Sequence, residues 1–356
     1  MSKTGMSEID AASVLFPVAV ADRVEAFAAT DLFRHGCRRG RFRGRNGGRG
    51  RLGSKGGFAY HLGIHSPRSL SPTPMRDNPH PGFALPSYRF IALVGRDAQV
   101  FAHAQFMNDV KSLESGTWQW NGWLTPKGRV IALFALLKFD DEHLGLLLLD
   151  ADPEAFGAAL RRYVFRSKLV IDVRHHWQAS GSISAPLQAA GNAIAGSLEN
   201  GIELDLGGDG GPRTLRIAAN GAGTADVDAA ARWTAFDLEH GLPRLPPSQA
   251  EQWTPQMLSL DRLRAFSVKK GCYPGQEIVA RTHFLGQAKR GLVLFEADAP
   301  VAVGSEVRSG ERVLGTVVSA EGRLALAVLP LERDANVLSV SESALQERPL
   351  LDGLMR

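Results

Sequence analysis

The stretch from Lys269 to Arg281 gathers a thiol, several cations and a carboxylate within one short segment. Cationic neighbours lower the pKa of a cysteine and favour the thiolate, which is the nucleophilic and metal-binding form. Glycine and proline residues on both sides of Cys272 are typical of a shaped loop. The chemistry alone fits two interpretations equally well: a reactive thiol held in a loop, or a lysine-flanked turn with a small buried thiol.

The order of residues in this segment carries a family resemblance. Lys-Gly-Cys-Tyr-Pro-Gly-Gln-Glu at 270–277, followed by Arg281, resembles the signature of YgfZ-like folate-binding proteins. These are relatives of the glycine-cleavage T-protein, an aminomethyltransferase, and act in iron–sulfur cluster assembly and tRNA modification. The resemblance implies a functional loop, with Cys272 as its reactive thiol, made of Lys270, Cys272, Tyr273, Gln276, Glu277 and Arg281.

Further segments match the same family in the same order. They are Gly95–Val110, Pro126–Arg129, Tyr163–Ile171 and Arg232–Gly241. The resemblance implies two interwoven α+β lobes around a central folate cavity, followed by a C-terminal antiparallel β-barrel. The sequence pattern independently indicates an α+β class, because strand pairs are interleaved with single helices.

The resemblance also implies the ligand and its contacts. Trp233 falls on a folate-contacting tryptophan, Glu239 on the acidic position associated with the pterin, and Tyr88 on a position that often holds a second tryptophan. An indole face can stack on a flat pterin, and a carboxylate suits its N–H donors. We therefore expect tetrahydrofolate or a derivative as the cofactor. Without the family, Trp233 fits ordinary core packing, and Glu239 fits a solvated residue near a helix end.

One departure from the T-protein bears on activity. The T-protein relies on an aspartate shortly after the glycine turn, whereas this chain has only apolar side chains from Val130 to Phe134. No carboxylate is available there to hold the reacting centre. We expect folate binding without classical aminomethyltransferase turnover. A lone thiolate cannot hold an iron–sulfur cluster, which takes four cysteines, so no stably bound metal is expected.

The positive charge of the chain is concentrated in one tract. Residues 34–56 hold eight Arg, one Lys and no acidic residue, and without these nine cations the net charge of +4 becomes −5. We therefore do not expect direct nucleic-acid binding outside residues 34–56. Residues 1–86 form a low-complexity extension that is predicted to be disordered or not native, with Met75 as a possible true start. We assign residues 87–283 to the folate-binding lobes and 284–356 to the barrel.

Cysteine content and hydropathy predict the compartment. Cys37 and Cys272 form neither a disulfide framework nor a zinc pattern, which indicates a reducing compartment. The apolar runs are far shorter than the roughly 20 residues that span a bilayer. We expect a cytoplasmic protein with no membrane association.

Periodicity and capping residues predict the elements that position these groups. Helices are predicted from Asp97 to about Val110, with Val100, Ala104 and Met107 on one face, from Asp152 through Tyr163, and from Asp226 to His240. Strands are predicted at 88–94, 116–123, 130–139, 144–149, 169–173 and 215–218, and short barrel strands at 292–295, 306–308, 313–318 and 324–329.

The leading hypothesis is a folate-binding accessory protein that supports iron–sulfur enzymes, including tRNA-modifying ones. Its expected partners are folate, iron–sulfur assembly factors and client enzymes. One alternative is a folate-dependent one-carbon transferase, against which the missing aspartate argues. The other is an RNA-binding protein that acts through residues 34–56.

Overall fold

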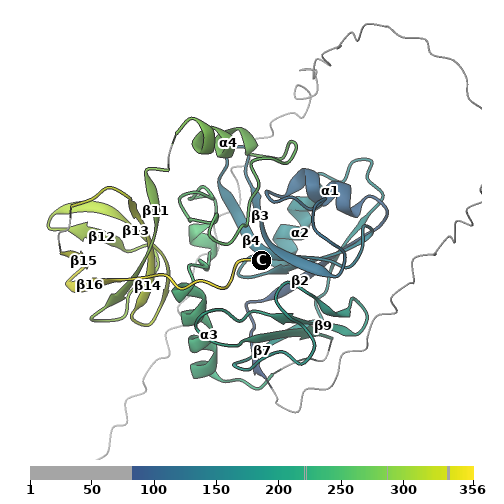
Figure 1. The fold of residues 1–356 in the computed structure, drawn as a ribbon, viewed down its shortest axis with the longest axis horizontal. Helices are drawn as coiled ribbons and strands as arrows, with labels where there is room; N and C mark the ends of the chain where they lie inside the picture. Colours follow the sequence, from purple (N-terminus) through teal and green to yellow (C-terminus); the bar gives the residue numbers. More distant parts are fainter. Residues whose placement is uncertain (1–81, 220, 222, 287, 335–336) are drawn as a thin grey trace, which may run out of the picture. The chain divides into compact units, whose positions relative to one another are not determined.

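The computed structural model describes residues 82–356 except 220, 222, 287 and 335–336. Two five-stranded sheets and a closed barrel make up this part of the chain (Figure 1). The predicted disorder of residues 1–86 falls almost wholly outside the described residues. The exception is β1 at Phe83–Ala84, which is a strand of the folded body.

One sheet carries the family-matching segment Pro126–Arg129 between β3 and β4, which we call the lysine–glycine turn. Its strand order is β3-β4-β5-β2-β6, and every neighbouring pair is antiparallel. The strands are β2 (Arg89–Val94), β3 (Thr117–Leu124), β4 (Val130–Lys138), β5 (His143–Leu148) and β6 (Val170–Val173). β6 lies at one edge of this sheet.

The other sheet has the order β1-β7-β10-β9-β8. Its remaining strands are β7 (Gln178–Ser182), β8 (Ala195–Ser197), β9 (Gly201–Asp205) and β10 (Thr214–Ala218). Because β1 precedes β2 in the chain yet pairs with β7, the two lobes are interwoven.

The C-terminal strands close into a barrel in the order β11-β14-β13-β12-β15-β16. They are β11 (Arg290–Ala297), β12 (Glu306–Ser309), β13 (Arg312–Glu321), β14 (Leu324–Pro330), β15 (Leu338–Val340) and β16 (Ser343–Arg348). The predicted α+β class with a C-terminal antiparallel barrel is confirmed.

Two of the helices in the described residues, α2 (Pro153–Arg161) and α3 (Val227–Glu239), begin at carboxylates that cap their first turns. The others are α1 (Ala98–Gln105) and α4 (Gln276–Phe284), with a 3-10 turn, η1, at Pro247–Gln249. Asp152 accepts a hydrogen bond from Ala155 N at 2.7 Å, and Asp226 accepts one from Ala229 N at 2.9 Å. Each carboxylate thus satisfies an N–H group that the first turn leaves unpaired.

Two apolar cores cover the two faces of the first sheet. Phe101 of α1 and Phe156 of α2 pack with Phe134 on one face. Leu133 and Leu137, on the other face of β4, join a larger core that includes residues of the second sheet, α3 and the barrel. Both faces of β4 are buried, and this explains why its sequence is an almost continuous apolar run.

Three predictions about elements were wrong. α1 ends at Gln105, because Met107 N bonds Gly122 O of β3 instead of continuing the helix. Val100 and Ala104, predicted on one face with Met107, are exposed, whereas Met107 is buried beyond the end of the helix. The second half of the signature is helical as α4 and not part of a loop.

No helix in the described residues is long and apolar enough to cross a membrane.

Candidate functional site

Lys270 anchors the signature to the end of α1. Its ammonium donates hydrogen bonds to the carbonyl oxygens of His103, Phe106 and Asn108, the last at 3.2 Å. A helix leaves its last carbonyls without partners inside the helix, and its C-terminal end favours a cation. Lys270 is 5% exposed, and burial lowers its pKa to about 7. Its side chain is therefore fixed against the end of α1, as an ammonium below about pH 7 and as a neutral amine above it.

Two further signature residues fix the loop from within. The Tyr273 hydroxyl donates to Ser267 O at 3.1 Å, and Gln276 Nε2 donates to Lys270 O at 3.1 Å. The Tyr273 ring lies 4.7 Å from Lys270 Nζ, a cation–π contact. Burial raises the pKa of Tyr273 to about 12, so the phenol stays neutral and keeps donating. These residues hold a single loop conformation.

The lysine–glycine turn packs against the same loop. Gly275 has a φ of 79°, and a Cβ there would lie 2.6 Å from Thr125 O and 2.7 Å from the Cα of Gly128. Gly128, with a φ of 69°, would in turn bring a Cβ to 2.9 Å from Ile278. Only glycine allows both the left-handed backbone and this approach. The turn and the signature therefore form one unit.

The other half of the signature faces solvent. Cys272 is exposed, as are Glu277 and Arg281 on the first turns of α4. Arg281 forms an ion pair with Glu277 at 3.0 Å, four residues earlier on the helix. Val279 is the buried residue of this helix. The loop thus presents an accessible thiol, a carboxylate and a guanidinium on an anchored backbone.

The predicted folate contacts Tyr88 and Trp233 come together in the interior. Trp233 Nε1 donates to the Tyr88 hydroxyl at 2.9 Å, and that hydroxyl donates to Asp237 at 3.3 Å. The exposed fractions are 1% for Tyr88 and 0% for Trp233. The guanidinium of Arg213 lies 4.2 Å from the Trp233 ring centroid. Their role as folate contacts stays a prediction.

Asp237 is the centre of a buried ion network that sequence reasoning missed. It pairs with Arg213 at 2.8 Å and with Arg244 at 3.3 Å, and Arg244 also pairs with Asp150 at 2.6 Å. Two cations and two carboxylates balance in charge. Burial, followed by the charge of Asp237, raises the pKa of Tyr88, so the phenol stays protonated. The sequence signal that could have revealed this network is Asp237 itself, a charged residue among apolar residues on the buried face of α3.

The third predicted folate contact lies apart from that network. Glu239 is the last residue of α3, half-buried, and its carbonyl accepts a hydrogen bond from Leu351 N at 2.8 Å. The structure therefore joins Tyr88 to Trp233, whereas Lys270, Tyr273 and Gln276 form a separate group around the loop. Whether Glu239 meets a pterin stays a prediction.

β4 is the strand on which the resemblance to the T-protein would place the catalytic aspartate. The strand begins at Val130, whose N–H bonds Trp253 O at 2.8 Å, and its inward side chains are apolar. In the described residues, no group of three histidine, cysteine or acidic side chains is arranged to hold a metal ion.

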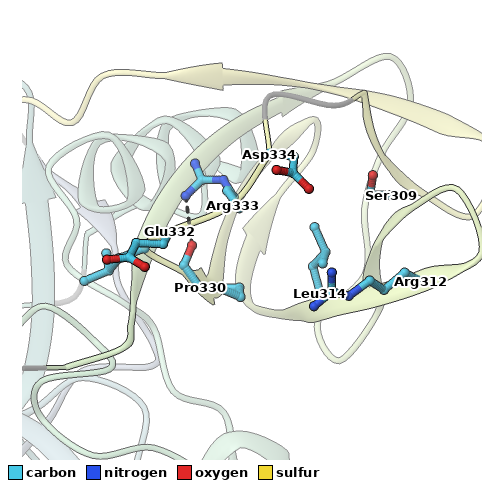
Figure 2. Close-up of a pocket in the computed structure, with 8 residues that line it drawn as sticks. Ser309, Arg312, Leu314, Pro330, Glu332, Arg333 and Asp334 are labelled. Carbon is cyan, nitrogen blue, oxygen red and sulfur yellow. Dashed lines mark hydrogen bonds between the residues drawn. The ribbon is translucent and has the colours of Figure 1, made fainter.

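A cavity of about 660 Å³ lies on the barrel (Figure 2). Its lining includes Arg312, Leu314 and Arg333, and Arg333 donates to Pro330 O at 3.1 Å. None of the predicted site residues lines it.

The sequence of this chain is similar to those of several known proteins. No protein-family model matches the chain. An uncharacterized protein of Haemophilus influenzae is 30% identical over 245 residues, which cover 67% of this chain and 83% of that protein. A tRNA-modifying protein YgfZ of Vibrio vulnificus is 28% identical, covering 75% of this chain and 90% of its own length. Another of Photobacterium profundum is 24% identical, covering 70% and 83%.

A solved structure shares the fold. The aminomethyltransferase T of the glycine cleavage system from Bartonella henselae superposes with a TM-score of 0.60 at 13% identity, covering 76% of this chain and 84% of that one. At this identity the likeness concerns the fold.

Proposed function

The chain belongs to the YgfZ-like family, and from this premise we propose that it is a folate-binding accessory protein that supports iron–sulfur enzymes, including those that modify tRNA. One observation carries the proposal. The signature divides into anchors, Lys270, Tyr273 and Gln276, and an accessible thiol, Cys272. A loop that is fixed on one side and open on the other suits brief contacts with a partner protein.

The thiol is the proposed working group of the loop. Cys272 is the free cysteine of the described residues, and a single thiolate cannot retain a cluster on its own. We propose that its thiolate acts by transient ligation to iron brought by assembly factors or client enzymes in a reducing, cytoplasmic setting.

Complementation of a strain that lacks its own YgfZ tests this role. Cys272→Ala should fail to restore the activity of iron–sulfur enzymes, whereas Lys269→Ala, the exposed neighbour that makes no anchor, should restore it. Full restoration by Cys272→Ala would remove the thiol from the mechanism.

Folate binding is tested on the full chain by calorimetric titration with tetrahydrofolate. Glu239→Gln removes a half-buried charge at the end of α3 and should weaken binding about tenfold or more, since charge-assisted hydrogen bonds contribute about 1.5–3 kcal/mol. Glu199→Gln, an exposed carboxylate elsewhere, is the matched control. No heat of binding with the unsubstituted chain would reject the folate part.

The absence of a carboxylate at 130–134 leads us to propose that folate is bound without aminomethyl transfer. Glycine-cleavage assays supplied with H-protein and tetrahydrofolate should show no turnover. Clear turnover would instead support the one-carbon transferase alternative.

A further inference from the structure

A segment between α2 and β6 is both basic and aromatic. Residues 161–168 read Arg-Arg-Tyr-Val-Phe-Arg-Ser-Lys, and no acidic residue occurs from Ala155 to Ile171. Arg162, Arg166 and Lys168 are exposed, and Phe165 is 84% exposed. We call residues 161–168 the basic–aromatic segment.

The folded body fixes this segment on both sides. Val164 and Leu169 pack against the core under α1 and α2. Lys168 N donates to the Asp97 carboxylate at 2.7 Å, and a Cβ on Gly95 would lie 2.3 Å from Lys168 O. The segment is therefore held against the Gly95–Asp97 turn, which adds exposed Arg96 to its cations.

Of the two aromatic side chains in the segment, Phe165 is the one that is more open to solvent. The Arg166 guanidinium lies 5.2 Å from the Phe165 ring centroid. Tyr163, 49% exposed, touches Trp123 edge-on at 5.8 Å. Phe165 thus presents an open ring beside a cation, which is the combination on which unpaired bases stack.

Acidic side chains near the segment already have partners. Asp172 pairs with Arg174 at 2.7 Å, and Glu154 pairs with His175 at 2.8 Å. Asp97 is engaged by the Lys168 backbone. The 140–142 turn also approaches, since Gly95 N bonds Glu142 O at 2.8 Å, so Glu142 limits the positive field on that side.

We propose that the basic–aromatic segment binds RNA that contains unpaired bases, with phosphates at Arg162, Arg166 and Lys168 and a base stacked on Phe165. Cations neutralise the phosphate backbone, and a stacked base needs an aromatic face free of other contacts. The proposal rests on the proposed function only for the choice of RNA. It differs from the expectation, drawn from net charge, that no nucleic acid binds outside residues 34–56. The rest of the chain is acidic on average, but the basic–aromatic segment is a local cluster of cations.

The test measures affinity of the full chain for a fluorescent RNA stem–loop and for a fully paired RNA duplex, at several salt concentrations. One variant carries Arg162→Glu, Arg166→Glu and Lys168→Glu. Its matched control carries Lys289→Glu, Arg312→Glu and Arg348→Glu, which change the net charge equally. All variants keep residues 34–56, so any binding through that tract is common to them.

The segment variant should bind the stem–loop at least tenfold more weakly than its control. Its slope of log affinity against log salt should be smaller by about two, since each contacted phosphate contributes about 0.7. Phe165→Ala should weaken stem–loop binding by about fivefold or more and leave duplex binding unchanged, whereas Phe284→Ala on α4 should change neither.

Equal affinities in the segment variant and its control would overturn the proposal. Unchanged RNA affinity with lost binding of a poly-glutamate peptide would also overturn it, and would assign the surface to an acidic protein. Tetrahydrofolate titration of the same variants separates the two ideas. Folate binding should survive in all of them, and its absence throughout would count against the proposed function and not against the RNA surface.

Discussion

Arg213 and Lys270 are both buried cations, but different partners hold them. Arg213 pairs with Asp237 inside a network of two cations and two carboxylates. Lys270 is held by three backbone carbonyls at the end of α1. A carboxylate compensates a buried charge, whereas carbonyl dipoles compensate it only in part. Arg213 therefore belongs to a charge-balanced ion cluster beside Tyr88 and Trp233, whereas Lys270, which anchors the thiol loop, is a cation whose charge depends on pH.

Removal of Asp237 should have the largest effect. Asp237→Asn leaves Arg213 as a buried charge without its counterion, and the free energy of unfolding should fall by about 3–5 kcal/mol. Chemical denaturation measures this. Asp352→Asn breaks the exposed pair with Arg262 and should cost about 0.5 kcal/mol or less. Similar losses in the two variants would show that the network is not the stronger structural element.

The second-largest effect should be the pH dependence that Lys270 gives to the free energy of unfolding. The pKa of Lys270 is about 7 in the folded chain and ordinary, near 10.4, in the unfolded chain. Between these values the unfolded chain binds more protons, so stability rises with pH. The unfolding free energy of the unsubstituted chain, relative to Lys270→Met, should increase by about 1 kcal/mol per pH unit from 7 to 10.

A flat difference across that range would mean that the three carbonyls keep the ammonium fully charged. Lys270 would then resemble Arg213, and the distinction between the two cations would disappear. Below pH 7 both states are protonated, so Lys270 should contribute no slope there.

The loss of the anchor itself should have a smaller effect. At pH 6, Lys270→Met leaves the carbonyls of His103, Phe106 and Asn108 without their donor, which should cost about 1–3 kcal/mol. Lys269→Met changes the exposed neighbour and should cost about 0.5 kcal/mol or less. Iodoacetamide should also modify Cys272 at a different rate in Lys270→Met than in Lys269→Met, measured in a Cys37→Ser background. Equal modification rates in the two variants would show that the Lys270 anchor does not affect the reactivity of the Cys272 thiol.

Sequence patterns predicted the fold where the local signals were strong. Asp152-Pro153 and Asp226 mark helix starts, and the apolar run from Val130 marks a strand buried on both faces. Short strands such as β8 and β15, of three residues each, carry no such pattern. α4 was missed because Gly275 at its start and polar residues along it resemble a loop.

The sequence predicted which residues belong to the candidate site, but it did not predict what each of them does. The signature placed Lys270 beside Cys272, yet nothing local shows that the ammonium turns toward α1, because its acceptors lie over 160 positions earlier in the chain. Asp237 was passed over for the same reason, since Arg213 and Asp150 come from distant segments. Long-range partners decide which charges are structural.

The smallest effect should come from the solvent-facing half of the signature. Glu277→Gln removes the ion pair with Arg281, whose side chains are 80% and 63% exposed, and should change the unfolding free energy by about 0.5 kcal/mol or less. Complementation should fall clearly even so, if Glu277 serves the accessible thiol and not the fold. The matched variant is Glu306→Gln, which breaks an exposed pair with Arg308 on the barrel and should leave complementation intact. A carboxylate that matters for function and hardly at all for stability would mark α4 as the working face that Lys270 holds in place.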